Sequence, residues 1–293
     1  MTPVSDSVAI ALEQVEVVPG RPEQNRDLCL RRAESALAAG ADLVVLPELA
    51  IGGYVVDPGR AREVAEPLDG PTTAAFSTLA GRTGGMVAYG FCESAGSGRQ
   101  DAELFNTVVV VDGDGPVLHY RKLHLFDREL EAYTPGDRGL PIARTRFGVL
   151  GVCICYDLRF VEVLRAMSLR GAEIVLAPAA WVGGYDARVP TAGATRHAES
   201  VIAQANLDQV AVVAVSQVAG AGAGGPATLG GSVAVDAYGE LLAGPLSRTG
   251  ADAAVVRVDL AAVRAARVRS ATIRPREDRR TDVYAVQYRG ETW

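Results

Sequence analysis

Cys155 is the residue whose type and position in this sequence best suit covalent chemistry. It follows an almost wholly apolar run at residues 149–154, which predicts a buried strand, and Phe160, Leu164 and Met167 then recur at helical spacing. The first amide groups of a helix carry partial positive charge, so a thiol beside them is favoured as thiolate. We therefore expect a nucleophilic cysteine at the joint between this strand and the helix.

Packing alone is the alternative explanation for a cysteine in this position. Free cysteine is among the most buried residue types, and Cys153 keeps that structural interpretation because it lies inside the apolar run, on the same face as Cys155. The catalytic interpretation of Cys155 therefore depends on partners elsewhere in the chain.

Glu48 is the first candidate partner. It lies just beyond the apolar strand Leu43-Val-Val-Leu46, at the strand end where open α/β sheets bind their ligands. The segment that begins at Gly40 recurs as Gly171-Ala-Glu-Ile-Val-Leu-Ala-Pro178, which indicates two similar β-α-β halves. Because the second copy has Ala179 where the first has Glu48, the strand end itself does not require a carboxylate. A solvated glutamate remains the alternative.

Lys122 is the second candidate, and it is the single lysine among 29 basic residues, the other 28 being arginine. A surface cation could be either residue, whereas a compact ammonium on a flexible stem does what a planar guanidinium cannot. The alternative is that one lysine survives by chance.

Hydrophobic periodicity and turn residues predict the remaining elements. We expect strands at 8–12, 86–91, 106–111, 116–120, 210–216, 231–236 and 254–258, and helices at 23–39, 71–80, 191–208 and 259–267. A hairpin turn is expected at Asp112-Gly-Asp-Gly115. Residues 1–293 are predicted to form one domain, with 270–293 as an arm that packs on a partner subunit.

Composition excludes several classes of protein. Apolar residues make up 48% of the 293 and charged residues 22%, which is typical of a globular protein, and a net charge of −6 argues against a nucleic-acid partner. The N-terminus has no basic region, and no apolar run approaches the roughly 18 residues that span a bilayer, so we expect no membrane association and a cytoplasmic location. Four cysteines in a chain of this length predict reduced thiols.

Two other sequence patterns, for dinucleotide binding and for metal binding, are not supported by the residues around them. Gly220-Ala-Gly-Ala-Gly-Gly225 fits a dinucleotide fingerprint, but Pro226 follows where a helix should begin, so we interpret the run as a loop. The three histidines show no metal-ligand spacing, and we interpret His124 as a support for the loop near Lys122. We expect neither a metal nor an organic cofactor.

Together the motifs resemble the nitrilase superfamily of carbon-nitrogen hydrolases, over nearly the whole chain. The family's glutamate matches Glu48 in Leu46-Pro-Glu-Leu49, its lysine matches Lys122 in Tyr120-Arg-Lys-Leu-His124, and its cysteine matches Cys155 in Ile154-Cys-Tyr-Asp-Leu-Arg-Phe160. A further family glutamate matches Glu129, with Glu131 as the alternative, and the segment at 278–284 is similar to the family's C-terminal arm.

This resemblance implies a four-layer α-β-β-α sandwich whose subunits pair into a homodimer or a larger assembly. It implies that Glu48 is the general base, that Cys155 is the nucleophile, and that Lys122 stabilises the oxyanion together with the backbone N–H of Tyr156. Glu129 would orient Lys122. Tyr156, Tyr54 and Trp181 are expected to bind substrate.

The leading hypothesis is an amidase that acts on a small linear primary amide, because the loop at 126–136 resembles the simpler amidases. Hydrolysis of an N-carbamoyl amine or of a nitrile is the alternative within the family. The chain departs from frequent family residues at Ala180 and at 204–209, which leaves the acyl group open. A nucleotide-binding oxidoreductase would depend only on the run at Gly220, and a catalytically dead partner protein would require a missing catalytic residue.

Overall fold

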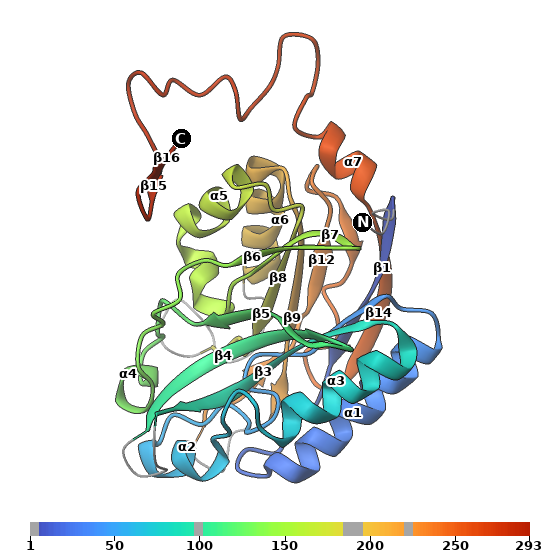
Figure 1. The fold of residues 1–293 in the computed structure, drawn as a ribbon, viewed down its shortest axis with the longest axis vertical. Helices are drawn as coiled ribbons and strands as arrows, with labels where there is room; N and C mark the ends of the chain where they lie inside the picture. Colours follow the sequence, from blue (N-terminus) through green and yellow to red (C-terminus); the bar gives the residue numbers. More distant parts are fainter. Residues whose placement is uncertain (1–5, 97–101, 184–195, 220–224) are drawn as a thin grey trace.

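The computed structural model describes residues 6–96, 102–183, 196–219 and 225–293, and its strands form two six-stranded sheets (Figure 1). The first sheet consists, in spatial order, of β14 (Asp252–Asp259), β1 (Ser7–Gln14), β2 (Leu43–Val45), β3 (Met86–Ala95), β4 (Glu103–Asp112) and β5 (Gly115–Arg121). The second consists of β13 (Leu241–Ala243), β12 (Val233–Val235), β9 (Ala211–Ser216), β8 (Ile174–Ala179), β7 (Gly148–Val152) and β6 (Ile142–Thr145).

The two sheets repeat one pattern of strand directions. In the first, β1, β2 and β3 are parallel and β4 is antiparallel to β3; in the second, β7, β8 and β9 are parallel and β12 is antiparallel to β9. The repeated sequence segments supply the middle strands of the parallel triplets, β2 and β8. The prediction of two similar β-α-β halves is therefore confirmed, and the strands run nearly uninterrupted in Val, Leu and Ala because they are buried on both faces.

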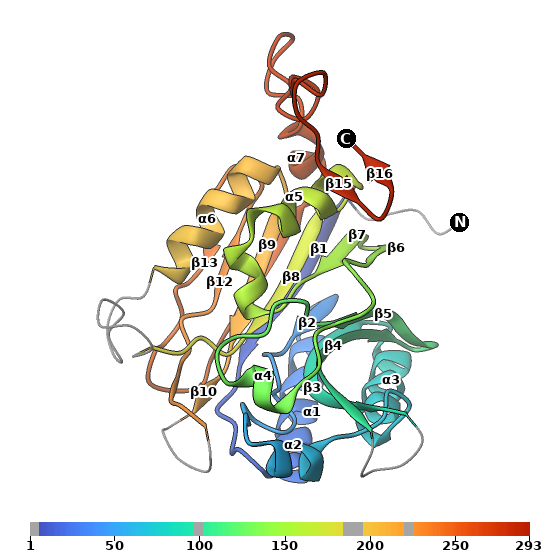
Figure 2. The same cartoon turned by 90° about the vertical axis from the view of Figure 1, so that its left-hand side faces the viewer.

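Helices cover the outer faces of the two sheets, while the inner faces pack on each other (Figures 1 and 2). Helices α1 and α3 lie on the first sheet and α5 and α6 on the second, which gives the expected α-β-β-α layers. The helices are α1 (Pro22–Ala38), α2 (Pro58–Val64), α3 (Pro71–Thr83), α4 (Glu129–Ala132), α5 (Val161–Leu169), α6 (His197–Asp208) and α7 (Leu260–Ala265).

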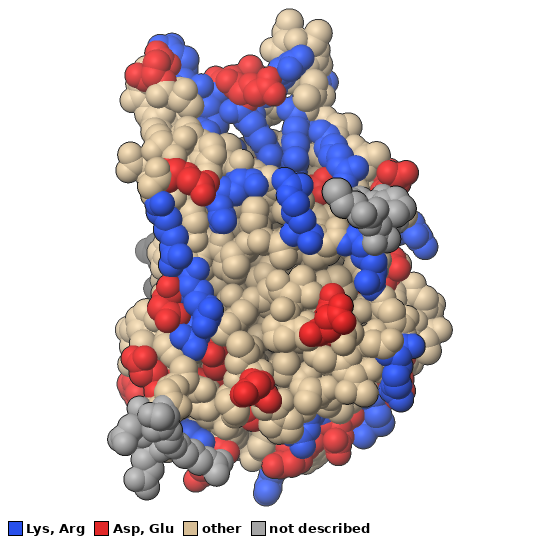
Figure 3. Space-filling model, in the orientation of Figure 1, with Lys and Arg blue, Asp and Glu red and all other residues tan. Residues whose placement is uncertain are grey.

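Smaller elements complete the described part of the chain. Short strands pair as β10 (Val218–Ala219) with β11 (Thr228–Leu229), and as β15 (Gln287–Tyr288) with β16 (Glu291–Thr292). The C-terminal segment extends beyond α7, and Arg side chains gather over that end of the molecule in Figure 3. Its hairpin contacts the chain's own loop, where the backbone N–H of Leu140 donates to the Tyr288 hydroxyl at 2.6 Å.

Most predicted elements are present, with boundaries shifted by a few residues. The turn at 112–115 joins β4 to β5, as the sequence predicts. The run after Cys155 is different, because a 3-10 turn at Cys155–Arg159 precedes α5, which begins only at Val161. The first part of the helix expected at 191–208 and the glycine run at 220–224 lie outside the described residues.

A buried ionic cluster fixes the end of β5, from which the chain runs on toward Lys122. Glu93 on β3 accepts from Arg121 at 2.6 Å and from Thr107 at 2.8 Å, and it pairs with His119 at 2.7 Å. Burial opposes ionisation of this carboxyl, but the hydrogen bonds from His119 and Arg121 outweigh burial and lower the pKa of Glu93 to about 2.

Substitution Glu93→Gln should lower the free energy of unfolding by about 3 kcal/mol, because it leaves buried Arg121 without its main counter-charge. The contribution of Glu93 should be present above pH 4.5, its ordinary pKa, and should disappear as the pH falls toward 2. Urea unfolding at a series of pH values measures both effects. As a control, Glu131→Gln removes an exposed carboxylate that pairs only with Arg128 within one helical turn, and it should leave stability nearly unchanged.

Candidate active site

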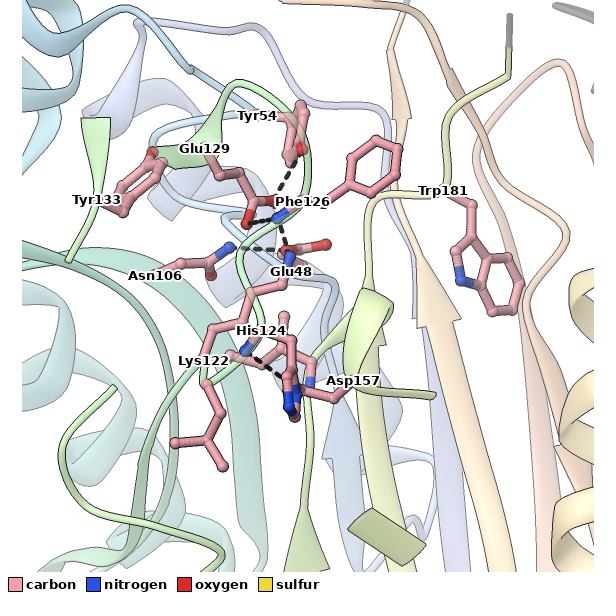
Figure 4. A network of polar contacts seen from close by, with 12 residues as sticks. Glu48, Tyr54, Asn106, Lys122, His124, Phe126, Glu129, Tyr133, Asp157 and Trp181 are labelled. Carbon is pink, nitrogen blue, oxygen red and sulfur yellow. Dashed lines mark hydrogen bonds and ion pairs between the residues drawn. The ribbon is translucent and has the colours of Figure 1, made fainter. Parts of the chain in front are cut away.

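Lys122 lies between two carboxylates in the interior of the protein (Figure 4). Its Nζ is 2.6 Å from Glu48 Oε1 and 2.7 Å from Glu129 Oε1, and all three side chains are fully buried. Burial favours the neutral amine, but the charges of Glu129 and Glu48 outweigh burial and raise the pKa of Lys122. The sole lysine is therefore a buried, permanently protonated ammonium and not a surface cation.

Glu48 reaches this position through a tight backbone turn after β2. Leu49 has a φ of 47°, in the left-handed region that a leucine rarely adopts. Gly90 on β3 packs directly against the turn, and a Cβ built there would lie 2.5 Å from the Leu49 nitrogen and 2.7 Å from the Glu48 Cα. Only glycine at position 90 leaves room for this turn, so β3 determines where the Glu48 side chain begins.

Glu129 is held by the loop between β5 and β6. Its Oε2 accepts the backbone N–H of Phe126 at 3.1 Å, and its Oε1 accepts from the Tyr54 hydroxyl at 2.8 Å as well as from Lys122. Burial raises the pKa of Glu129, although Lys122 opposes that rise. Glu131, the alternative from the sequence, is exposed and pairs with Arg128. The structure thus brings Glu129, and not Glu131, to the ammonium.

Cys155 lies at a sharp turn between β7 and α5. Its φ is 48°, a conformation that costs on the order of 1–3 kcal/mol for a residue other than glycine and is common at functional sites. Asp157, fully buried, stabilises the turn because its Oδ2 accepts both the backbone N–H of Ile154 at 2.8 Å and the Tyr120 hydroxyl at 2.7 Å. Its Oδ1 pairs with His124 at 2.7 Å, so Asp157 joins the Cys155 turn to the Lys122 loop.

The expectation that Cys155 is a thiolate is wrong for the resting protein. Burial raises the pKa of the Cys155 thiol well above its usual range, and the negative charge of Glu48 raises it further. Lys122 and the backbone N–H of Ala180 oppose this shift without overcoming it. The helix N-terminus that the sequence suggested is a short 3-10 turn. Cys155 is thus a protonated thiol, and a base must remove its proton during any attack.

A cavity of about 380 Å³ opens over Cys155. Tyr156 and Trp181 belong to its wall, where the sequence placed them, and the Trp181 ring stacks on His197 with ring centroids 4.7 Å apart. The other described residues of the wall are Phe126, Leu158, Arg159, Ala180, Val182 and Ser200. The cavity is thus mainly apolar and aromatic, with room for a small organic substrate.

Tyr54 does not belong to the described wall of this cavity, which differs from the substrate-binding role expected for it. It is buried behind Glu129, to which its hydroxyl donates, and burial together with Glu129 raises its pKa. Tyr54 therefore contacts the charged cluster and not the space above Cys155.

Sequence analysis missed several residues that the structure brings to the site. Asn106 donates to Glu48 Oε1 at 2.7 Å, Gln217 donates to the Glu48 backbone carbonyl at 2.8 Å, and Asp157 organises the cysteine turn. Asn106 was noted only as the start of a strand. A polar side chain in an otherwise apolar strand was the available signal, and nothing local to the sequence relates it to Glu48, which lies 58 positions away.

Glu48 Oε2 is buried and has no hydrogen-bond partner in the described structure. A carboxylate oxygen without a hydrogen-bond partner, on a residue whose charge acts on the Cys155 thiol, is a candidate proton acceptor. Within the same residues, no group of three or more His, Cys, Asp and Glu side chains forms a candidate metal site. The helices described in the structure are all too short or too polar to cross a membrane.

Known proteins are similar to this chain in sequence. An (R)-stereoselective amidase from Pseudomonas sp. is 34% identical over 80% of this chain and 79% of its own length. A hydrolase from Mycobacterium tuberculosis is 30% identical over 88% of this chain and 91% of its own. The match to a hydrolase of Pseudomonas protegens covers only 52% of that protein, so this chain spans about half its length.

Solved structures show the same fold. An amidase from Nesterenkonia sp. superimposes with a TM-score of 0.76 at 25% identity, covering 97% of each chain. Saccharomyces cerevisiae Nit3, from branch 10 of the nitrilase superfamily, superimposes with a TM-score of 0.78 at 24% identity, covering 92% of this chain and 96% of that one. The carbon-nitrogen hydrolase profile matches residues 9–268. The chain therefore belongs to the carbon-nitrogen hydrolases of the nitrilase superfamily and is an enzyme of that hydrolase family.

Proposed function

We propose that this protein hydrolyses a small linear primary amide through a thioester on Cys155, releasing ammonia and a carboxylic acid. The observation that carries the proposal is the buried Lys122 ammonium beside a Glu48 carboxylate whose Oε2 has no partner in the described structure. The charges of both groups act on the Cys155 thiol at the cavity floor. A base, a fixed cation and a nucleophile at one point are the requirements of acyl transfer.

In the first half of the reaction, the Cys155 sulfur attacks the amide carbon while its proton passes to Glu48 Oε2. The oxyanion that forms is stabilised by Lys122 and by the backbone N–H of Tyr156, which belongs to a first turn whose amides lack intrahelical partners. The C–N bond then breaks, and Glu48 returns the proton to the departing nitrogen, so that ammonia leaves and the thioester remains.

Hydrolysis of the thioester reverses these roles. Glu48 takes a proton from an attacking water, the C–S bond breaks, and the proton returns to the Cys155 sulfur as the acid leaves. Glu129 holds Lys122 throughout, and Tyr54 in turn holds Glu129. Tyr156 and Trp181 form walls that fit a small acyl group.

Relatives of this chain include enzymes named for two other substrate classes. The family includes an N-carbamoylputrescine amidase from Arabidopsis thaliana, 35% identical over 51% of this chain, and a nitrilase from Pyrococcus abyssi, 33% identical over 69% of it. A screen of ammonia release over separate panels of amides, ureido acids and nitriles distinguishes the three classes by which panel reacts, and release of carbon dioxide with ammonia confirms a ureido acid. Activity confined to nitriles or ureido acids would overturn the amide assignment.

We also propose that the enzyme works in the cytoplasm as a homodimer or larger assembly, in which the segment at 270–293 packs on a partner subunit. Apolar side chains on that segment support the assembly, since Ile273, Val283 and Tyr284 are each more than half exposed. Exposed apolar groups gathered on one extended segment are typical of an interaction surface.

The nucleophile can be tested with a matched pair of cysteine variants. Cys155→Ala should abolish ammonia release, because no thioester can form. Cys153→Ala, a modest truncation in the core two residues away, should retain most of the turnover. Turnover and melting curves of both purified variants decide the matter. Equal loss of activity in two folded variants would assign the chemistry elsewhere.

The base is tested by Glu48→Gln, which keeps the shape of the side chain and removes its ability to accept a proton. Turnover should fall by about two to four orders of magnitude. Steady-state kinetics on the best amide from the screen give the measurement, and thermal melting confirms that the variant is folded. Near-normal turnover would show that Glu48 Oε2 does not receive the thiol proton.

Lys122→Arg tests whether a compact ammonium is required. The larger planar guanidinium cannot occupy the space between Glu48 and Glu129 without displacing one of them or the substrate. Turnover should collapse, and crowding in the fully buried site should also lower stability by about 1–3 kcal/mol. Turnover close to wild type in this variant would remove the oxyanion role assigned to Lys122.

A further inference from the structure

Asn106 on β4 contacts both Lys122 and Glu48. Its backbone carbonyl accepts the backbone N–H of Lys122 at 2.8 Å, and its side-chain Nδ2 donates to Glu48 Oε1 at 2.7 Å. The residue is fully buried. One rigid strand position thus connects the backbone that carries the ammonium to the carboxylate that faces it (Figure 4).

The two oxygens of Glu48 are in different surroundings. Oε1 accepts hydrogen bonds from both the Lys122 ammonium and the Asn106 amide, whereas Oε2 has no hydrogen-bond partner in the described structure. An ammonium is a point charge that a carboxylate can approach with either or both oxygens. The planar Asn106 amide also restricts orientation, because its N–H must lie near the plane of the carboxylate that accepts it. Asn106 therefore fixes the rotation of the Glu48 carboxylate group.

From this geometry we propose that Asn106 is a positioning residue that occupies Glu48 Oε1 and so leaves Oε2 as the oxygen that exchanges protons with Cys155. The inference rests on the function proposed above and extends it to a residue outside the base, cation and nucleophile. Without the amide, the carboxylate can rotate so that both oxygens approach Lys122, and neither then faces the thiol.

Asn106→Leu removes the donor at nearly constant volume. Because Asn106 contacts the proposed base, Glu48, kcat should fall by about 10- to 100-fold, which is the effect of losing a hydrogen bond to a charged group. The KM should change little. The ratio of its activity to that of wild type should be nearly the same across the pH range. Retention of more than half of the wild-type kcat in folded protein would overturn the proposal.

Asn106→Asp should respond to pH in a way that a merely space-filling role cannot explain. Two carboxyl groups at hydrogen-bond distance share one proton, and the shared proton restores a donor to Glu48 Oε1. Activity relative to wild type should therefore be highest at acid pH and should fall as the pH rises and the shared proton is lost. A ratio that does not change with pH would count against the positioning role.

Thr107→Val is the matched control on the same strand. It also removes a buried hydrogen bond, from the Thr107 hydroxyl to Glu93, at constant volume, and should lower the melting temperature without changing the pH profile. If Asn106→Leu fails to fold, Asn106→Ala replaces it, since it also removes the donor. Retention of more than half of the wild-type kcat in folded Asn106→Ala would overturn the proposal.

The outcomes separate this inference from the proposed function. If wild-type enzyme releases no ammonia from any amide, the function fails and no Asn106 variant is needed to show it. If wild type is active and Glu48→Gln is not, while Asn106→Leu and Asn106→Asp both behave as wild type, then the function stands and only the positioning role is wrong.

Discussion

A single ammonium buried between two carboxylates is the interaction on which the rest of this structure depends. Removing three charged groups from water costs several kcal/mol for each ion, and their mutual attraction offsets that cost only where the geometry is good. Lys122 Nζ meets both oxygens at 2.6 and 2.7 Å, so the geometry is good. The chain must therefore bring Glu48, which follows β2, to Lys122 and Glu129 in the connection between β5 and β6, and much of the local structure serves that requirement.

Strained backbone is one consequence of this requirement. Leu49, directly after Glu48, and Cys155 both adopt left-handed φ angles, and each costs on the order of 1–3 kcal/mol. Packing overcomes the cost in both places. Gly90 gives the first turn room, and Asp157 accepts hydrogen bonds from Ile154 in the second turn and from Tyr120 on β5. The first turn follows β2 of one parallel triplet and the second follows β7 of the other, so each repeated half of the fold supplies one of the two residues, Glu48 and Cys155.

The layers, the repeat and the charged residues could be predicted from the sequence because each of these features has a local sequence signal. Cys155 ends an apolar run, and Lys122 is the only residue of its type. The thiol pKa was predicted in the wrong direction, because a strand-to-helix joint does not reveal burial or the facing charge of Glu48. The surroundings of Tyr54 have no local signal either: an aromatic residue near a site can face the substrate or the ions behind it, and only tertiary packing decides between them.

The raised pKa of Cys155 has a chemical advantage that a free thiolate would lack. One ammonium and two carboxylates give the buried cluster a net charge of −1, and a thiolate beside it would add a second uncompensated negative charge in a medium of low dielectric. If the thiol proton moves to Glu48 as the sulfur attacks, the negative charge passes from that carboxylate to the oxyanion and the total stays constant. Lys122 remains next to the charge at each stage, so the reaction relocates a buried charge and does not create one. A thiol that ionises only with substrate bound also withholds its nucleophile from other electrophiles.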